Sequence, residues 1–301
     1  MYYCDLNLNE INDKYQKVFN PFFMSKKMDL IVDFKEGKIP YIIFKNTGLH
    51  LKCDEENIEN NSLDMDLRLC FISSVFKCLE INPITYEGEN NGYLFRKVTP
   101  VKSFEKTKSS FGGKEELGFH VDNNHLSLTP EASEEGKSKA PDYLSLLCIR
   151  NNEKVPTIIS DINQAIKSLT ENELNILLDK RYTIDYPDSF KVSGKVEAPV
   201  LVKSEEGFYS RFDYAFTTPN DKDAKKAFDK LNQILTENSQ DINLDSGDLI
   251  IFRNQKVVHG RKKFNPKYDG FDRFLIRLFG VDELRDIVTV SDDQPYHSVS
   301  I

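Results

Sequence analysis

Several kinds of segment are missing from this 301-residue sequence. It contains no run of about 18 or more apolar residues, and its polar N-terminus lacks a basic region followed by an apolar one. We therefore expect neither a membrane span nor a signal peptide. Because no long Pro, Gly or Ser tract is present to act as a linker, the sequence predicts one domain over residues 1–301, located in the cytoplasm.

Paired cysteines and blocks of like charge are also missing. The odd number of cysteines and the absence of C-x-x-C spacing predict reduced thiols rather than disulfides or a zinc site. They are Cys4, Cys53, Cys70, Cys78 and Cys148. The net charge is −8 and the 40 Lys and Arg are scattered, so nucleic acid is not an expected partner. The sequence carries no signal for the oligomeric state.

What the sequence does contain is a series of short apolar runs separated by turn residues, which favours strands. We expect strands within 39–49, 93–101, 141–149, 155–160, 206–216, 248–252, 257–260 and 273–281. The run 155–160 is expected to pair with 141–149 across the polar turn RNNEK. Helical periodicity appears in 62–79, after Asp161, after a Thr170–Glu173 capping box, and in 224–235. The pattern predicts a mainly β fold, a barrel or jelly roll with helices packed outside.

Two of the five histidines lie where a metal site is expected. His120 stands in GFHVDNNH with Asp122 two residues later, and His259 stands in KVVHGR near the end of a strand. Residues i and i+2 of a strand project from one face, so His120 and Asp122 can enter one cavity. Two imidazoles and a carboxylate on one face of an octahedral ion suit iron(II) oxygenases. The residues alone leave an alternative open, in which the H-x-D spacing arises by chance and His259 is a hydrogen-bonded histidine of the core.

Two arginines that follow His259 indicate anion binding. Arg273 and Arg277 stand four residues apart in RFLIRLFGV, so both guanidinium groups lie on the same face of the strand. Apolar residues surround them, and burying an arginine without a partner is costly. Because a planar guanidinium fork matches a carboxylate, the pair predicts two anionic ligands.

These motifs resemble the clavaminate synthase-like branch of the TauD-type iron(II)/2-oxoglutarate oxygenases. The first block of that family, H-x-D/E followed by P-[DE]-[YF] and a strand with C-x-R, is similar to GFHVDNNH and PDYLSLLCIR. The second block is similar to SGDLIIFRNQKVVHGRKKFNPKYDGFDRFLIR. The resemblance covers residues 88–281 and implies a distorted double-stranded β-helix (jelly-roll) core with helices packed outside. It also implies iron(II) on His120, Asp122 and His259, 2-oxoglutarate as co-substrate, and O2.

The resemblance further implies roles for individual residues. By motif position, Arg273 would bind the distal carboxylate of 2-oxoglutarate, with Thr157 as a hydroxyl partner. Arg277 would take the α-carboxylate of the substrate. Ser110, which lies ten positions before the first histidine, and Asn90 in ENNG would help to hold the substrate backbone.

Relatives in this branch oxidise free amino acids such as arginine, lysine and asparagine, which sets the expected substrate class. Asp213, in SRFDYAF, occupies a position where several relatives use an acid on the substrate side chain, so we expect a basic amino acid. The alternative is a salt bridge from Asp213 to Arg211. Asp122 occupies a position that halogenating relatives leave without a carboxylate, which favours oxygen transfer.

Other functions stay open at this point. The same site could serve an asparagine-type hydroxylase, a desaturase or a cyclising oxidase. A cupin-type hydrolase or isomerase has no need for the arginine pair, and a non-catalytic ligand-binding module would form no succinate. The polar stretch 126–140 is expected to be either an active-site lid or a plain surface loop. His125 is expected to be structural.

Overall fold

The protein is described by a computed structural model that covers residues 28–45, 47, 62–105, 111–187, 190 and 192–300. The fold is mainly β, with strands in four sheets and helices on the outside. The largest sheet has seven strands in the order β1-β13-β5-β15-β2-β16, with β3 also pairing with β15. Its strands are β1 (Tyr41–Phe44), β2 (Asn82–Tyr86), β3 (Arg96–Val98), β5 (Tyr143–Arg150), β13 (Leu249–Arg253), β15 (Phe274–Val281) and β16 (His297–Ser298).

A second sheet of four strands has the order β12-β6-β14-β4. Its strands are β4 (Leu117–His120), β6 (Thr157–Asp161), β12 (Gln240–Ile242) and β14 (Val257–Arg261). The predicted pairing of 155–160 with 141–149 is wrong, because β6 pairs with β12 and β14 whereas β5 pairs with β13 and β15. The polar segment after β5 therefore joins two sheets instead of closing a hairpin.

The two sheets share one apolar core. Alternate residues of β5 and β15, such as Leu144, Leu146 and Leu275, pack in one cluster with Ile159 of β6 and Val257 of β14. This alternation is expected because successive strand residues point to opposite faces. The inner faces of the two sheets are therefore packed on each other, and the strands are buried on both faces.

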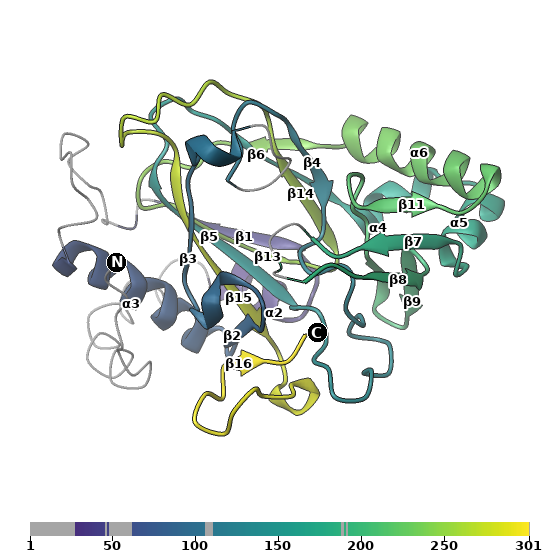
Figure 1. The fold of residues 1–301 in the computed structure, drawn as a ribbon, viewed down its shortest axis with the longest axis horizontal. Coiled ribbons are helices and arrows are strands. Elements are labelled where there is room, and N and C mark those ends of the chain that lie inside the picture. Colours follow the sequence, from purple (N-terminus) through teal and green to yellow (C-terminus); the bar gives the residue numbers. More distant parts are fainter. Residues whose placement is uncertain are drawn as a thin grey trace.

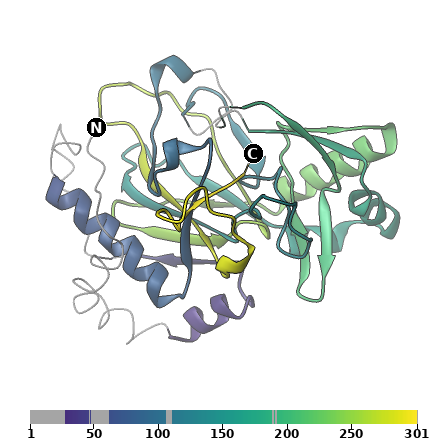
Figure 2. The ribbon, with the colours of Figure 1, turned by 60° about the horizontal axis from the view of Figure 1, so that its bottom comes forward.

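Helices cover the outer faces of both sheets. Helices α2 (Met28–Lys35) and α3 (Ser62–Cys78) lie against the large sheet, where Phe71 and Phe76 pack on Tyr143 and Ile276. Helices α4 (Ile162–Ala165), α5 (Glu171–Leu178) and α6 (Lys222–Glu237) lie on the small sheet. Figures 1 and 2 show α3 and α6 at opposite ends of the molecule, with the two sheets between them.

Two smaller sheets lie beside α5 and α6 (Figure 1). They are β11-β7-β8 and β10-β9, formed by β7 (Tyr182–Asp185), β8 (Lys195–Ala198), β9 (Leu201–Ser204), β10 (Gly207–Ser210) and β11 (Thr217–Pro219). The strand expected over 206–216 is only partly confirmed, because β10 ends at Ser210 and the chain then turns before β11. The helical predictions are confirmed, including the capping box of Thr170 and Glu173 at the start of α5.

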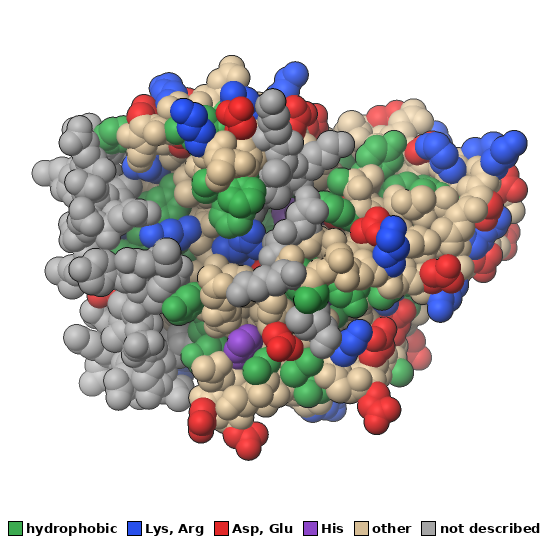
Figure 3. Space-filling model, in the orientation of Figure 1, with side chains coloured by type: hydrophobic (Ala, Val, Ile, Leu, Met, Phe, Trp, Pro, Cys, Tyr) green, Lys and Arg blue, Asp and Glu red, His purple; other side chains and the backbone are tan. Residues whose placement is uncertain are grey.

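Among the described residues, no helix is both long and apolar enough to cross a membrane. On the face shown in Figure 3, Lys and Arg side chains are interspersed with Asp and Glu side chains.

Candidate active site

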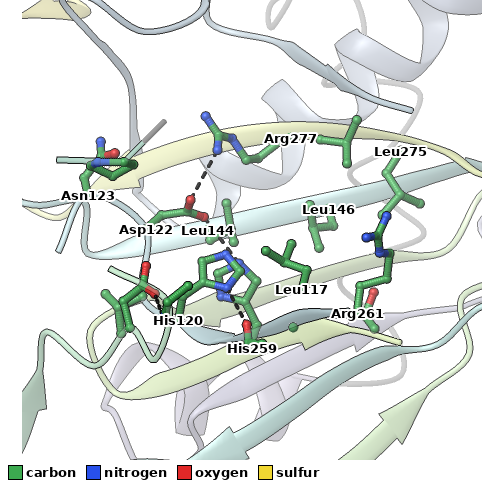
Figure 4. Close-up of a pocket in the computed structure, with 18 of the residues that line it drawn as sticks. Leu117, His120, Asp122, Asn123, Leu144, Leu146, His259, Arg261, Leu275 and Arg277 are labelled. Atoms are coloured by element: carbon green, nitrogen blue, oxygen red, sulfur yellow. Dashed lines mark hydrogen bonds and ion pairs between the residues drawn. The ribbon is translucent and has the colours of Figure 1, made fainter. Parts of the chain in front are cut away.

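Three potential metal ligands meet between the inner faces of the two sheets. His120 ends β4, Asp122 follows two residues later, and His259 lies in β14 directly opposite His120. One donor atom from each of the three lies within 4.8 Å of the others, and Figure 4 shows the three side chains pointing toward one another. Gly260 lets the strands approach this closely, because a Cβ there would lie 2.6 Å from the carbonyl oxygen of Leu117.

The surroundings of this cluster favour a bound cation. Burial alone would raise the pKa of the Asp122 carboxyl, but Arg277 and the two imidazoles outweigh burial and hold this pKa well below its usual range. Burial, followed by the neighbouring His120, lowers the pKa of His259 to about 4. The cluster therefore presents an ionised carboxylate and a neutral His259 ring at neutral pH, which is the protonation state that a metal requires.

The orientation of the ligands also fits a metal. The His120 ring bonds through Nδ1 to the carbonyl oxygen of Gly118 at 2.9 Å, which leaves its Nε2 for the cluster. The Nε2 atom of His259 lies 3.4 Å from Oδ2 of Asp122. Two imidazole nitrogens and one carboxylate oxygen form the donor set that suits non-haem iron(II). The residues present therefore fit this ion.

The pocket beside the cluster has an apolar wall and charged ends. Figure 4 shows Leu117 and Leu146 between the histidine cluster and Arg261, which stands apart from it. Arginines, Thr157 and Asp213 supply the polar groups of the lining. A mostly apolar cavity with a few convergent polar groups is typical of small-molecule sites.

Thr157 and Arg273 lie together at one end of the pocket. Arg273 donates from Nη2 to the Thr157 hydroxyl at 2.9 Å. Burial first, and the nearby charge of Arg261 second, lower the pKa of Arg273 to about 10, so the group remains charged at neutral pH. No acidic side chain among the described residues forms an ion pair with Arg273, so an anionic ligand would be its natural partner.

Arg277 lies near the metal cluster, and its environment contains a residue that the sequence analysis missed. Its Nη1 lies 3.3 Å from Oδ1 of Asp122, and its Nη2 donates to Oε1 of Glu89. Arg96 of β3, which is the register partner of Arg277, donates to the same oxygen of Glu89 at 2.5 Å. All three side chains of this Glu89 cluster (Glu89, Arg96 and Arg277) are buried. Both arginines also line the pocket.

Asp213 also lines the pocket, beside the metal cluster. It forms an isolated β-bridge with His120, and its Oδ1 accepts hydrogen bonds from the backbone N–H groups of Ala215 and Phe216. Burial raises the pKa of the Asp213 carboxyl. The alternative salt bridge to Arg211 is not formed, because Arg211 pairs with Glu131 instead.

The predicted substrate residue Asn90 is not part of the pocket lining. Asn90 lies in a 3-10 turn and donates its amide N–H groups to the carbonyls of Tyr93 and Phe95, at 2.6 and 3.2 Å. It does not line the pocket, whereas its neighbour Glu89 contacts two arginines that do. The role of Asn90 in holding the substrate backbone therefore stays a prediction. Ser110 lies outside the described residues.

The segment 126–140, expected to be a lid or a surface loop, contributes no residue to the pocket lining. Leu126, Leu128 and Ala140 are buried in the core, and Ser138 bonds to Val299 through its backbone N–H. The role of this segment as a lid stays a prediction, and its position in the structure does not support it. Pro187, Ala215 and Phe216 lie at the pocket instead.

A model of a known protein family covers the part of the chain that lines the pocket. The family model described as taurine catabolism dioxygenase TauD, TfdA family, matches residues 86–279, which is more than half of the chain. This range contains all three potential metal ligands together with Thr157, Asp213, Arg273 and Arg277.

Curated relatives and solved structures give matches of moderate identity. The chain is 25% identical over 204 residues to an L-lysine 3-hydroxylase of Catenulispora acidiphila, covering 65% of this chain and 54% of that protein. It is 30% identical over 208 residues to an L-asparagine oxygenase of Streptomyces coelicolor, covering 68% and 59%. The chain thus spans less than two thirds of the length of either relative. A structure of asparagine oxygenase with Fe(II), 3-hydroxyasparagine and succinate shares the fold, with a TM-score of 0.74, 24% identity and coverage of 91% and 84%.

Proposed function

Because the chain belongs to the taurine catabolism dioxygenase TauD, TfdA family, we propose that it is an iron(II)- and 2-oxoglutarate-dependent dioxygenase that hydroxylates a free L-amino acid with a basic side chain, lysine or arginine. The observation that carries this proposal is the cluster of His120, Asp122 and His259 in a pocket that is also lined by the buried Arg273 and Arg277. We also assign the two facing sheets to a distorted double-stranded β-helix, with residues 1–301 forming one domain.

In this proposal, His120, Asp122 and His259 hold iron(II) as a facial set. Bound iron(II) supplies the activation of O2 that couples oxidative decarboxylation of 2-oxoglutarate to hydroxylation of the substrate. Asp122 is ionised and His259 neutral without any further change, so the site needs little proton release to bind the ion. The hydrogen bond from His120 to the carbonyl of Gly118 fixes the ring orientation.

The co-substrate subsite is assigned to Thr157 and Arg273. Their contact places a hydroxyl and a guanidinium side by side, and the distal carboxylate of 2-oxoglutarate can accept hydrogen bonds from both. The apolar side chains of Leu146 and Leu275 line the pocket near this end and exclude water from it.

The substrate subsite is assigned to Arg277 and Asp213. Arg277 would bind the α-carboxylate, with its guanidinium oriented by Glu89. Asp213 offers a buried carboxylate, and among the described residues no Lys or Arg forms an ion pair with it, which favours a cationic group on the substrate. The L-lysine 3-hydroxylase among the relatives is consistent with that choice. Holding both ends of the amino acid would select which C–H bond is oxidised.

An asparagine-type hydroxylase is the second candidate. Asp213 is a single acid here, because the residue two positions earlier is Arg211, which is paired with Glu131. One carboxylate can accept a hydrogen bond from a carboxamide as well as from an ammonium group. The relative at 30% identity is an L-asparagine oxygenase.

A substrate panel tests the proposal. Iron-loaded protein is incubated in air with 2-oxoglutarate and each free amino acid in turn, and succinate and product mass are measured. We expect lysine or arginine to give succinate together with a product heavier by one oxygen atom, and the His259→Ala variant to give neither. Turnover with asparagine alone would favour the second candidate. The absence of amino-acid-dependent succinate, with no difference between wild type and His259→Ala, would overturn the enzyme assignment.

A further inference from the structure

Arg261 is a second buried arginine at the co-substrate end of the pocket, and the proposed function gives it no role. It ends β14, is 5% exposed and lines the pocket. Among the described residues, neither Arg261 nor Arg273 forms an ion pair with an acidic side chain. Burying one arginine without a counter-charge is already costly, and two such residues at one end of a cavity indicate a strongly anionic ligand.

The sheet brings Arg261 directly beside the assigned co-substrate subsite. Arg261 and Thr157 are register partners on neighbouring antiparallel strands, so their side chains lie next to each other on the same face. The Thr157 hydroxyl in turn accepts the hydrogen bond from Arg273. The two guanidinium groups therefore flank Thr157, and their positive charges repel each other. A carboxylate placed there would relieve this repulsion.

The guanidinium of Arg261 is held in place by two backbone carbonyls and an aromatic ring. Its Nη1 donates to the carbonyl of Gly112, and its Nη2 donates to the carbonyl of Glu115 at 2.9 Å. Its central carbon lies 5.2 Å from the ring centre of Phe264. The Nε atom is buried and has no hydrogen-bond partner among the described residues, and the same is true of Nε of Arg273.

We propose that Arg261 is a positioning residue of the co-substrate subsite. Its charge attracts the distal carboxylate of 2-oxoglutarate toward Thr157 and Arg273, and its fork fixes residues 112–115 beside that carboxylate. The inference rests on the proposed function and deepens it, because it assigns the selectivity for a 2-oxo diacid to two arginines rather than one. If Arg261 were purely structural, it would only hold residues 112–115 in place.

Arg253 offers a matched control on the large sheet. It also ends a strand, donates to two backbone carbonyls (Phe34 at 2.9 Å and Lys35 at 2.8 Å), and lies 5.3 Å from the ring centre of Tyr143. Its Nε is likewise buried without a partner among the described residues, but Arg253 does not line the pocket. Arg253→Gln therefore reproduces the loss of an arginine that holds two backbone carbonyls, here at the end of α2, without touching the co-substrate subsite.

Calorimetry on anaerobic, iron(II)-loaded protein measures ligand affinities without turnover and therefore tests the inference. Two ligands are compared, 2-oxoglutarate and 2-oxopentanoate, in which a methyl group replaces the distal carboxylate. We expect Arg261→Gln to weaken 2-oxoglutarate binding by about thirtyfold or more, the low end for loss of one partner of a buried charge pair. Its affinity for 2-oxopentanoate should stay within about twofold of wild type, because that ligand lacks the carboxylate on which Arg261 acts. Arg253→Gln should leave both affinities within about twofold.

Two results would overturn the inference. One is an equal loss of affinity for both ligands in Arg261→Gln, which is expected if Arg261 only holds residues 112–115 in place. The other is an unchanged affinity for both ligands. If Arg261→Gln does not fold, Arg261→Lys is tested instead, because lysine keeps the positive charge and loses the paired hydrogen bonds to two carbonyls. An affinity of Arg261→Lys for 2-oxoglutarate within about threefold of wild type supports the inference, and a loss of about tenfold or more contradicts it. Wild-type protein that binds no 2-oxoglutarate would instead refute the proposed function itself.

Discussion

Replacing Glu89 with glutamine should damage both stability and substrate binding, because this carboxylate is the shared partner of two buried arginines. Its Oε1 accepts from both Arg96 and Arg277, and the side chains of the three residues are 2%, 5% and 8% exposed. Glutamine keeps one acceptor oxygen but removes the negative charge. Two guanidinium groups would then repel each other in a site that water barely reaches.

The size of the effect follows from the burial of the pair. Removing one partner of a buried ion pair costs about 3–5 kcal/mol, and the retained acceptor oxygen argues for the lower end, about 3 kcal/mol. For a chain of this size, we expect a melting temperature lower by about 6 °C, at about 2 °C per kcal/mol. Loss of the orienting contact to Arg277 should also raise the KM for the amino acid by about tenfold, or about 1.4 kcal/mol of binding free energy.

Urea unfolding and steady-state kinetics measure the two effects separately. The KM for 2-oxoglutarate should change less than about twofold, since Thr157 and Arg273 lie at the other end of the pocket. Glu131→Gln is the matched control, because it breaks the ion pair of Arg211 outside the pocket lining. It should lower stability and leave both KM values unchanged. An unchanged amino-acid KM in folded Glu89→Gln would refute the assignment of Arg277 as a substrate anchor oriented by Glu89.

Three further predictions concern other parts of the site. Thr157→Val removes the hydroxyl bonded to Arg273 and should weaken 2-oxoglutarate binding about fivefold, or about 1 kcal/mol, in a calorimetric titration; unchanged affinity would exclude Thr157 from the subsite. Asp213→Asn should abolish the preference for basic over neutral amino acids in competition assays, and a retained preference would show that another acid recognises the substrate. Burial, more than any neighbouring charge, lowers the pKa of His125 to about 3, so the folded protein resists protonating this ring. Stability should therefore fall by up to about 3 kcal/mol as the pH drops from about 6.5 to 4, and His125→Phe should remove that part of the pH dependence, as measured by urea unfolding at both pH values.

Strand periodicity predicted the inner faces of both sheets correctly because it is a local property of the chain. His120 with Asp122, and Arg273 with Arg277, do line the same pocket, although Asp122 lies in the turn after β4 and Arg273 precedes β15. Periodicity does not say which strands are neighbours. The run that forms β6 is apolar and buried on both faces, so nothing in its pattern distinguishes pairing with β5 from pairing with β14.

The role of Glu89 could not be predicted for a different reason. Glu89, Asn90 and Asn91 are consecutive polar residues, and only the backbone decides which of them faces inward. Asn90 and Asn91 have positive φ angles of 48° and 54° in the 3-10 turn, which directs the amide of Asn90 to nearby carbonyls. The contact between Arg211 and Glu131 was also invisible, because it joins residues 80 positions apart.

Labelling with 18O2 tests the central claim most directly. Protein loaded with iron(II), 2-oxoglutarate and its amino acid should place one labelled oxygen atom in succinate and the other in the hydroxylated amino acid, with the two products formed in equal amounts. Mass spectrometry reads both products from one reaction. Label in neither product, or succinate without an oxygenated amino acid at saturating substrate, would contradict the account of His120, Asp122 and His259 as the iron site of an amino acid hydroxylase.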